Sequence, residues 1–319
     1  LAELAKAFGE ASMTDNGLRT GEQARQFAFG QVRDAVSGAV NQQIESWRSP
    51  WGNASVSLLV DNDGKFNGSS GSWFIPWNDN NRYLSWSQLG LTQQADGLVS
   101  NAGIGQRWVA GKWLLGYNTF YDNLLDENLQ RAGLGAEAWG ENLRLSANYY
   151  QPFAGWRDRS DVQEQRMARG YDVTAKAWLP WFHHLNTSVS FEQYFGDNVD
   201  LFNSGTGYHN PVAVNLGLNY TPVPLVTLTA AHKQGESGAS QNNLGLKLNY
   251  RFGVPLVKQL SAGEVAAMRS LRGSRYDSPE RNSLPVMEFR QRKTLSVWLA
   301  TPPWDLKGGE TVMLKLQVR

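Results

Sequence analysis

Apolar and polar residues alternate with a period of two from about residue 52 to residue 253. This spacing places successive side chains on opposite faces of a β-strand. In NNLGLKLNYRFG, residues 242–253, the apolar side chains from Leu244 to Phe252 fall on one face and the polar ones on the other. Twelve segments follow the pattern, and most have about ten residues, enough for a tilted strand to cross a bilayer. The predicted strands are 52–61, 69–76, 82–93, 99–109, 112–122, 129–139, 142–152, 169–180, 185–195, 211–221, 224–234 and 241–253.

The connections between the predicted strands alternate in length. Long loops such as 153–168 and 196–210 alternate with short turns such as 181–184. Outer-membrane barrels have long loops at the cell surface and short turns in the periplasm, whereas a soluble β-sandwich has no reason to sort its loops. The sequence therefore predicts an all-β membrane fold, with a twelve-stranded antiparallel transmembrane β-barrel over residues 51–253.

Charged residues lie on the polar faces of these strands. Buried in a dry core they would be costly, and a soluble barrel would place its larger apolar side chains inside. A wet lumen accommodates them. The residues predicted to line the pore and contact a chain inside it are Arg107, Arg131, Glu137, Arg144, Asp172, Lys176, Glu192, Lys247 and Arg251.

Aromatic residues gather near the strand ends, as the interfacial girdles of membrane proteins require. The predicted girdle residues are Trp108, Trp113, Tyr121, Trp139, Tyr149, Tyr150, Trp181, Tyr220 and Tyr250. In the last strand we expect Tyr250 and Phe252 to face lipid.

Residues 1–50 show apolar spacing typical of helix, and Thr20 with Gln23 matches a capping box. We interpret them as a periplasmic helical segment; an ordinary amphipathic helix of a soluble domain fits equally well.

Residues 254–285 are predicted to form a short helix followed by an extended linker. Ser261 and Glu264 match a capping box, Arg269 and Arg272 would occupy the last turn, and Gly273 would follow it. Pro279 and Pro285 exclude helix beyond that point. The helix would span only ~16 Å, but residues 274–288 could extend to ~50 Å, more than the ~30 Å hydrocarbon core. The linker can therefore thread the pore.

Residues 286–319 alternate again at 286–299 and 310–319, which indicates the start of a second β domain. This predicts an exported passenger.

Composition narrows the possible functions. The chain is 41% hydrophobic and 18% charged with a net charge of +1, which argues against disorder and against a nucleic-acid partner. It has no cysteine, which fits a secreted bacterial protein. We found no nucleotide-loop, nucleophile-elbow or metalloprotease motif, so we expect no catalytic residue, metal or cofactor. An outer-membrane protease site is suggested only in part, by Asp197, Asp200, His209 and His232.

The segment SAGEVAAMRSLRGSRYDSPERN, directly after YRFG, resembles the helix and the RYD-x-x-x-RN linker of intimin/invasin-type inverse autotransporters. The resemblance covers nearly the whole chain. Its linker residues are Ser261, Glu264, Arg269, Arg272, Gly273, Arg275, Tyr276, Asp277, Arg281 and Asn282.

This resemblance implies a Gram-negative outer-membrane translocator, in type V secretion, that anchors and exports its own adhesin or invasin passenger of Ig-like β-sandwich domains. The amino terminus would be periplasmic and the carboxy terminus at the cell surface. Implied partners are outer-membrane lipid and lipopolysaccharide, the barrel assembly machinery, periplasmic chaperones and a host-cell receptor beyond residue 319. In that setting Tyr250 and Phe252 would be the assembly signal of the closing strand. The alternatives are a barrel enzyme, protease or phospholipase, and a diffusion porin.

Electrostatics within the lumen suggests how the linker is held. We expect some of Arg269, Arg272, Arg275 and Arg281 to pair with Glu137, Asp172 or Glu192, because guanidinium–carboxylate pairs are strong where water is restricted. In the alternative interpretation the arginines are solvated and helix capping alone orders the segment.

Overall fold

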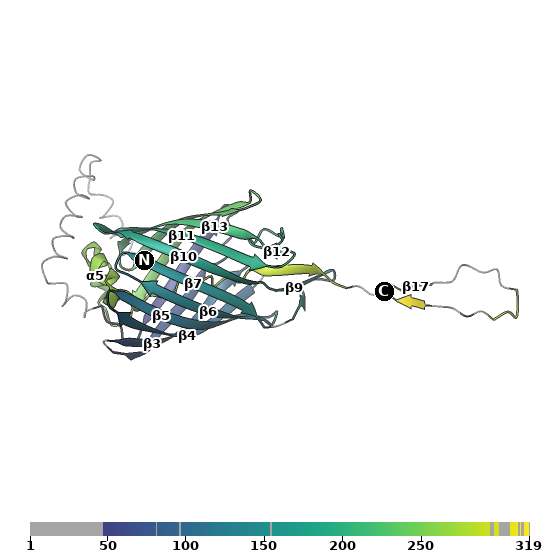
Figure 1. Cartoon of the computed structure of the whole chain (residues 1–319), viewed down its shortest axis with the longest axis horizontal. Helices are drawn as coiled ribbons and strands as arrows, with labels where there is room; N and C mark the ends of the chain where they lie inside the picture. The colour runs from purple at the N-terminus through teal and green to yellow at the C-terminus, as the bar shows by residue number, and fades with distance from the viewer. Residues whose placement is uncertain are drawn as a thin grey trace.

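The structure, a computed structural model, describes residues 47–319 apart from 81, 96, 154, 294–296, 300–306, 312, 314, 315 and 319. The predicted helix at 1–50, with Thr20 and Gln23, therefore lies outside the described residues except for 47–50. In the described part, twelve antiparallel strands close into a barrel (Figure 1), which confirms the predicted fold class. The barrel strands are β1 (Asn53–Asp61), β2 (Ser70–Asp79), β3 (Tyr83–Gln94), β4 (Gly97–Ala110), β5 (Trp113–Leu124), β6 (Leu129–Trp139), β7 (Leu143–Pro152), β10 (Arg169–Leu179), β11 (Phe182–Phe195), β13 (Val212–Val223), β14 (Val226–Gly235) and β15 (Ser240–Arg251).

Each barrel strand pairs with its neighbour in sequence, and β1 pairs with β15 to close the ring. In this seam Asn53 lies opposite Arg251, and Asp61 lies opposite Asn243. The predicted strand bounds agree with the observed ones to within three residues. Alternation was sufficient to find the strands because most of them have one largely apolar face.

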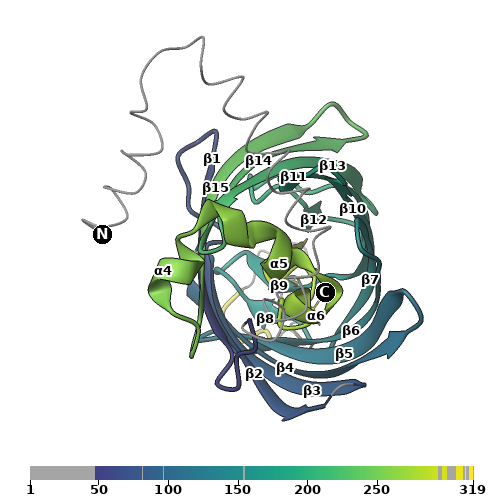
Figure 2. The ribbon, with the colours of Figure 1, turned by 90° about the vertical axis from the view of Figure 1, so that its left-hand side faces the viewer.

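One end of the barrel, here called the helix rim, carries the short helices α4 (Leu256–Gln259), α5 (Val265–Arg269) and α6 (Leu271–Ser274), with a 3-10 turn η1 (Ala262–Glu264) (Figure 2). They lie across the mouth of the barrel. Trp47 is buried against Val254 and Ala267 there, and its indole nitrogen donates to Glu264 at 3.2 Å.

The single helix predicted for this region is wrong, because the backbone is extended at Ser270 (φ −54°, ψ 156°). Ser270 Oγ accepts a hydrogen bond from the Gly273 N–H and caps α6. Ser261 caps no helix with its side chain, because its hydroxyl donates to the Val257 carbonyl of the preceding turn. Gly273 lies inside α6 rather than after it. A Cβ on Gly273 would lie 2.6 Å from the Met268 carbonyl oxygen.

The opposite end, the loop rim, carries a four-stranded sheet in the order β12 (Val199–Asp200), β16 (Met287–Gln291), β9 (Gln163–Met167) and β8 (Arg157–Asp158). β16 comes from the carboxy-terminal part of the chain and lies between strands of two barrel loops. Strands β17 (Val297–Leu299) and β18 (Leu316–Val318) pair with each other. The start of a passenger domain at 286 stays a prediction.

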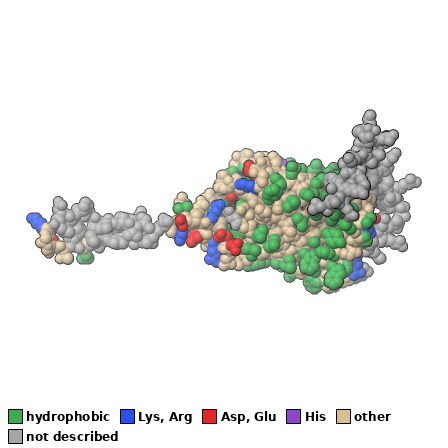
Figure 3. Space-filling model, turned by 180° about the vertical axis from the view of Figure 1, so that it is seen from behind, with side chains coloured by type: hydrophobic (Ala, Val, Ile, Leu, Met, Phe, Trp, Pro, Cys, Tyr) green, Lys and Arg blue, Asp and Glu red, His purple; other side chains and the backbone are tan. Residues whose placement is uncertain are grey.

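On the face seen in Figure 3, apolar side chains gather on the outside of the barrel wall. Leu134, Leu216 and Ile104 are more than half exposed there, whereas Arg107 and Arg131 on inward positions are fully buried. Two aromatic residues depart from the predicted girdle. Trp139 and Tyr150 have no exposed surface and point into the lumen, where arginines stack on them. None of the described helices is long and apolar enough to cross a membrane.

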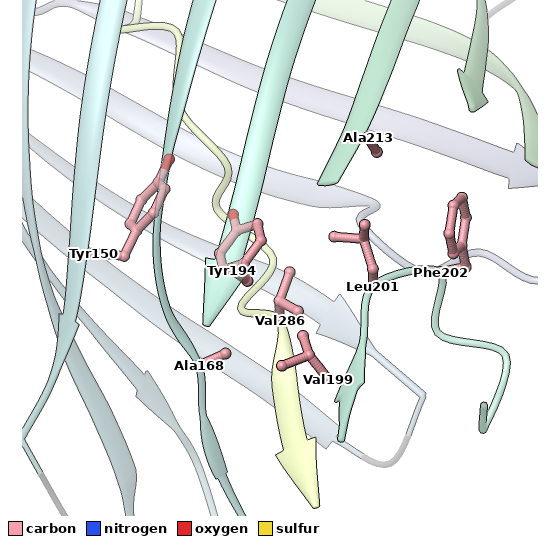
Figure 4. Packing of buried hydrophobic residues seen from close by; sticks show 8 residues of the cluster. All are labelled: Tyr150, Ala168, Tyr194, Val199, Leu201, Phe202, Ala213 and Val286. Atoms are coloured by element: carbon pink, nitrogen blue, oxygen red, sulfur yellow. The ribbon is translucent and has the colours of Figure 1, made fainter. Parts of the chain in front are cut away.

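A hydrophobic cluster lies in the lumen next to the loop rim (Figure 4). Tyr150 and Tyr194 project from neighbouring parts of the wall with their rings stacked at 6.2 Å. Leu201 and Phe202 come from the β11–β13 connection, and Val286 comes from the segment leading to β16. The cluster therefore joins the wall, a loop and the carboxy-terminal segment.

Candidate functional site in the barrel lumen

Residues 275–286, here called the lumen segment, run through the barrel from α6 at the helix rim to β16 at the loop rim. The segment touches the wall at successive levels, and at each level its backbone or a charged side chain has a partner. We describe these levels in order from the helix rim.

At the helix rim, Asp79 at the end of β2 receives two residues of the lumen segment. Its carboxylate lies 2.9 Å from Arg275 Nη2 and accepts a hydrogen bond from the Tyr276 hydroxyl. Asn53, the first residue of β1, donates from Nδ2 to the Tyr276 carbonyl at 2.6 Å. Tyr276 is 1% exposed, so its ring closes this level of the lumen.

One level further in, Asp277 is held by two wall arginines. Its Oδ2 lies 2.8 Å from Arg144 Nη2, and its Oδ1 lies 3.2 Å from Arg251 Nη2. Arg107 Nη1 donates to the backbone carbonyls of Arg275 and Asp277. Because guanidinium groups present several fixed donors, they can bind carboxylate and backbone together.

The guanidinium groups of two of these arginines stack on an aromatic ring of the wall. Arg107 and Arg144 stack on Trp139 at 4.3 and 4.2 Å from the ring centroid. Cation–π contacts of this kind are stronger where water is excluded. The ring fixes each guanidinium in the plane from which it reaches the lumen segment.

At the middle of the lumen, Glu280 lies 2.5 Å from Lys176 Nζ, and Asn148 donates to the Glu280 carbonyl at 2.7 Å. The next residue, Arg281, binds Asp122 in β5 through both terminal nitrogens, at 3.1 and 2.6 Å. Asp122 also accepts from Arg131 at 2.8 Å, so one buried carboxylate joins a wall arginine and a segment arginine.

Near the loop rim the lumen segment is held mostly by hydrogen bonds between uncharged groups. The Asn282 N–H donates to the Tyr150 hydroxyl at 2.7 Å, and its side-chain amide donates to the Tyr194 hydroxyl at 2.9 Å. Asn101 donates to the Ser283 carbonyl at 3.2 Å. The Ala168 N–H then donates to the Val286 carbonyl, which leads directly into the β16 pairing.

The structure does not bring the predicted pairs together. Glu137 binds Arg107 at 2.6 Å, Glu192 binds Lys233 at 2.6 Å, and Asp172 accepts from Tyr150 and Asn148. Arg275 and Arg281 do bind barrel carboxylates, but these are Asp79 and Asp122. The predicted partners are satisfied within the wall.

The other predicted linker arginines lie on the short helices. Arg269 donates to the Glu141 carbonyl at 3.1 Å and stacks on Trp178 at 3.4 Å. Burial and then the neighbouring Arg144 lower the pKa of Arg269 well below its ordinary value. Arg272 is exposed and has no ion pair among the described residues.

Sequence reasoning missed Asp79, Asp122 and Glu280. Asp122 had a usable signal, since it is an inward position of β5 directly opposite Arg131 in the pairing with β6. Glu280 lies within the quoted linker motif. Asp79 gave no signal, because it ends a strand beyond a register shift.

The closing strand ends at Arg251, one residue before Phe252. Tyr250 faces outward and is 38% exposed, while Phe252 is partly buried in the turn that follows. Their rings meet edge to face at 5.4 Å, and the Phe252 N–H donates to the Gly52 carbonyl. Both aromatic residues thus lie at the seam of the barrel.

Of the residues considered for a protease site, Asp197 and His209 contact each other, whereas Asp200 and His232 have other partners. His209 Nδ1 lies 3.2 Å from Asp197 Oδ1, and both side chains are mostly exposed. His232 bonds to Asn242, and Asp200 accepts from the backbone of Ser204. No catalytic arrangement follows from these contacts.

The geometry defines a class: a membrane-type barrel whose own carboxy-terminal chain occupies the lumen. A family model described as the inverse autotransporter β-domain matches residues 3–283. The chain therefore belongs to the inverse autotransporter β-domain family, and it is placed in the outer membrane with that family.

Relatives agree with this assignment. The chain is 76% identical over 318 residues to the uncharacterized protein YchO of Escherichia coli K12, covering all of this chain and 68% of YchO. It is 35% identical over 323 residues to invasin of Yersinia enterocolitica, covering all of this chain and 38% of invasin. A solved structure from work on the in-meso crystallization of membrane proteins matches with a TM-score of 0.71 and 31% identity, over 75% of this chain and all of that one.

Proposed function

We propose that this chain is a translocator that exports its own carboxy-terminal passenger through its barrel and retains the lumen segment there as a plug. The observation that carries this proposal is the unbroken path of the chain. It leaves β15 at the helix rim, passes inside the wall and joins a sheet at the loop rim. A diffusion pore has no use for such a path.

The connections support the proposed orientation of the barrel in the membrane. Strands β8, β9 and β12 belong to long loops at the loop rim, while β10 and β11 are joined at the helix rim by a short turn. Because outer-membrane barrels keep their short turns in the periplasm, the helix rim is the periplasmic end and the carboxy terminus reaches the cell surface.

Membership of the family supports the proposed partners. Invasin-like passengers imply adhesion to a host-cell receptor, and passenger domains of Ig-like fold would carry it. We further propose that Tyr250 and Phe252 act as the signal for the barrel assembly machinery, after periplasmic chaperones have delivered the chain. Outer-membrane lipid would surround the apolar wall, and lipopolysaccharide would surround the loop rim.

Because the chain lacks cysteine, single cysteines test the orientation and the export without background labelling. Exposed positions are available at Asp63 and Ser237 on the loop rim, Lys112 on the helix rim and Lys293 after β16. A membrane-impermeant maleimide should label cysteines at 63, 237 and 293 on intact cells, and the one at 112 only after permeabilisation.

Two outcomes would contradict the proposal in different ways. Labelling at 112 without labelling at 63 would invert the barrel in the membrane. Labelling at 63 and 237 with none at 293 would show that the barrel is correctly placed but its carboxy-terminal chain is not exported.

A further inference from the structure

Wall cations are concentrated in the half of the lumen next to the helix rim. Arg144, Lys176, Lys247 and Arg251, here called the cation belt, come from β7, β10 and β15. Lys176 lies directly opposite Arg144 in the β10–β7 pairing. No wall carboxylate among the described residues forms an ion pair with any of the four.

The only described carboxylates that bind the belt come from the lumen segment. Asp277 pairs with Arg144 and Arg251, and Glu280 pairs with Lys176. Lys247 interacts electrostatically with both carboxylates but has no ion pair within 4 Å in the described structure. Two acids thus occupy a site of four cations, which stays net positive.

The half of the lumen next to the loop rim has the opposite character. Asp122, Asp172 and Glu192 lie there with Arg131 and Lys233. A cavity of about 370 Å³ beside the lumen segment is lined by Asp172, Glu192 and Lys233 on the wall and by Arg281 on the segment. The sign of the wall charge therefore changes along the pore, and the segment matches it with acids at 277 and 280 and a cation at 281.

Three arginines next to the helix rim have the wrong charge for the belt. Arg269, Arg272 and Arg275 lie on its periplasmic side under the proposed orientation. Like charges repel most where water is restricted. Further movement toward the loop rim would carry Asp277 and Glu280 out of the belt and bring these arginines into it.

We infer that the cation belt is a binding site for acidic chain segments, which arrests the exported chain where Asp277 and Glu280 enter it. This inference rests on the proposed export function. The acids are held by ion pairs and the arginines behind them are repelled, so the chain has one preferred position in the pore without any covalent stop.

The test measures the position of the segment by disulfide formation in the full chain. Asn101 and Ser283 are in contact, so a cysteine pair at 101 and 283 reports the native position. Adding Asp277→Asn and Glu280→Gln should lower the cross-linked fraction by about threefold or more, since three ion pairs in a restricted space are lost. The matched control, Asp63→Asn with Glu236→Gln, removes the same two charges from exposed loop residues and should leave cross-linking unchanged.

A charge exchange separates electrostatics from a packing defect. Lys176→Glu alone and Glu280→Lys alone should each lower cross-linking, and the two together should restore it. Unchanged cross-linking in the Asp277→Asn, Glu280→Gln chain, or no recovery in the exchanged chain, would overturn the inference. If instead a cysteine at 293 is not labelled on intact cells in the parent chain, the proposed export function has failed and not the belt.

Discussion

Arg281 Nη2 lies 2.6 Å from Asp122 Oδ2 in the lumen, although the two residues are 159 positions apart in the chain. Both side chains are at most 5% exposed. Asp122 also binds Arg131, so removing the carboxylate leaves two buried guanidinium groups unpaired, whereas removing Arg281 leaves the wall pair intact.

Asp122→Asn should therefore destabilise the barrel more than Arg281→Gln. Breaking a buried ion pair while its partner remains costs about 3 kcal/mol or more. The unfolding temperature in detergent ranks the two variants. It is measured from the change in mobility between folded and unfolded barrel on a gel of unboiled samples. Equal temperatures for the two variants would show that Asp122 does not join the two arginines.

Gly105→Ala should weaken packing in the lumen wall. A Cβ at Gly105 would lie 2.4 Å from the Trp86 ring and 2.7 Å from the Tyr117 carbonyl oxygen. Overpacking of this kind costs about 1–3 kcal/mol, so the unfolding temperature in detergent should fall. Gly155→Ala is the control, since nothing lies within 4 Å of its Cβ position. A fall of the same size in the control would refute the packing explanation.

Glu288→Arg should loosen β16 from the loop-rim sheet. Glu288 lies opposite Arg166 in the β16–β9 pairing, and the two form an ion pair at 2.7 Å. The variant places two cations opposite each other, which destabilises antiparallel pairs. Limited proteolysis of outer membranes should then cut residues 286–293 faster. The exchange Arg166→Glu with Glu288→Arg should slow cutting again. If it does not, the ion pair does not hold β16 in the sheet.

Phe252→Asp should lower the amount of barrel in the outer membrane. The variant removes the aromatic contact with Tyr250 and puts a carboxylate beside the seam. We expect degradation before insertion, measured as loss of the folded band in outer-membrane fractions. Phe66→Asp makes the same change at an exposed loop position. Normal levels of the Phe252 variant would argue against an assembly signal here.

Arg275→Ser with Arg281→Ser should raise single-channel conductance in planar bilayers. Both arginines bind barrel carboxylates, so their loss frees the lumen segment at two levels. Arg272→Ser is the control, because Arg272 is exposed and has no ion pair in the described structure. Conductance equal to that of the parent chain would indicate that these pairs do not hold the plug.

The sequence was sufficient to predict the barrel but not the contacts inside it. Strand alternation depends only on lipid outside and water inside, and both act locally on each strand. The pairs formed by Asp277 and Glu280 depend on where a threaded chain stops relative to the wall. In two of these three pairs the partners are more than a hundred residues apart in sequence, and no local pattern contains that position.

The helix prediction failed for a local reason. Ser261 and Glu264 have the spacing of a capping box, but the Ser261 hydroxyl is already bonded to the turn before it. The break at Ser270 carried a weaker signal, since serine is a favoured cap residue. The apolar spacing nevertheless continues through Ser270 and favours one unbroken helix.

The barrel seam and the lumen segment share residues at the helix rim. Asn53 opens β1 and binds Tyr276, while Arg251 ends β15 and binds Asp277. Adjacent residues of the lumen segment thus bind both strands that close the barrel, β1 and β15. The lumen segment therefore also stabilises the barrel seam: its removal would take away the contacts that Asn53 and Arg251 make beside the β1–β15 pairing.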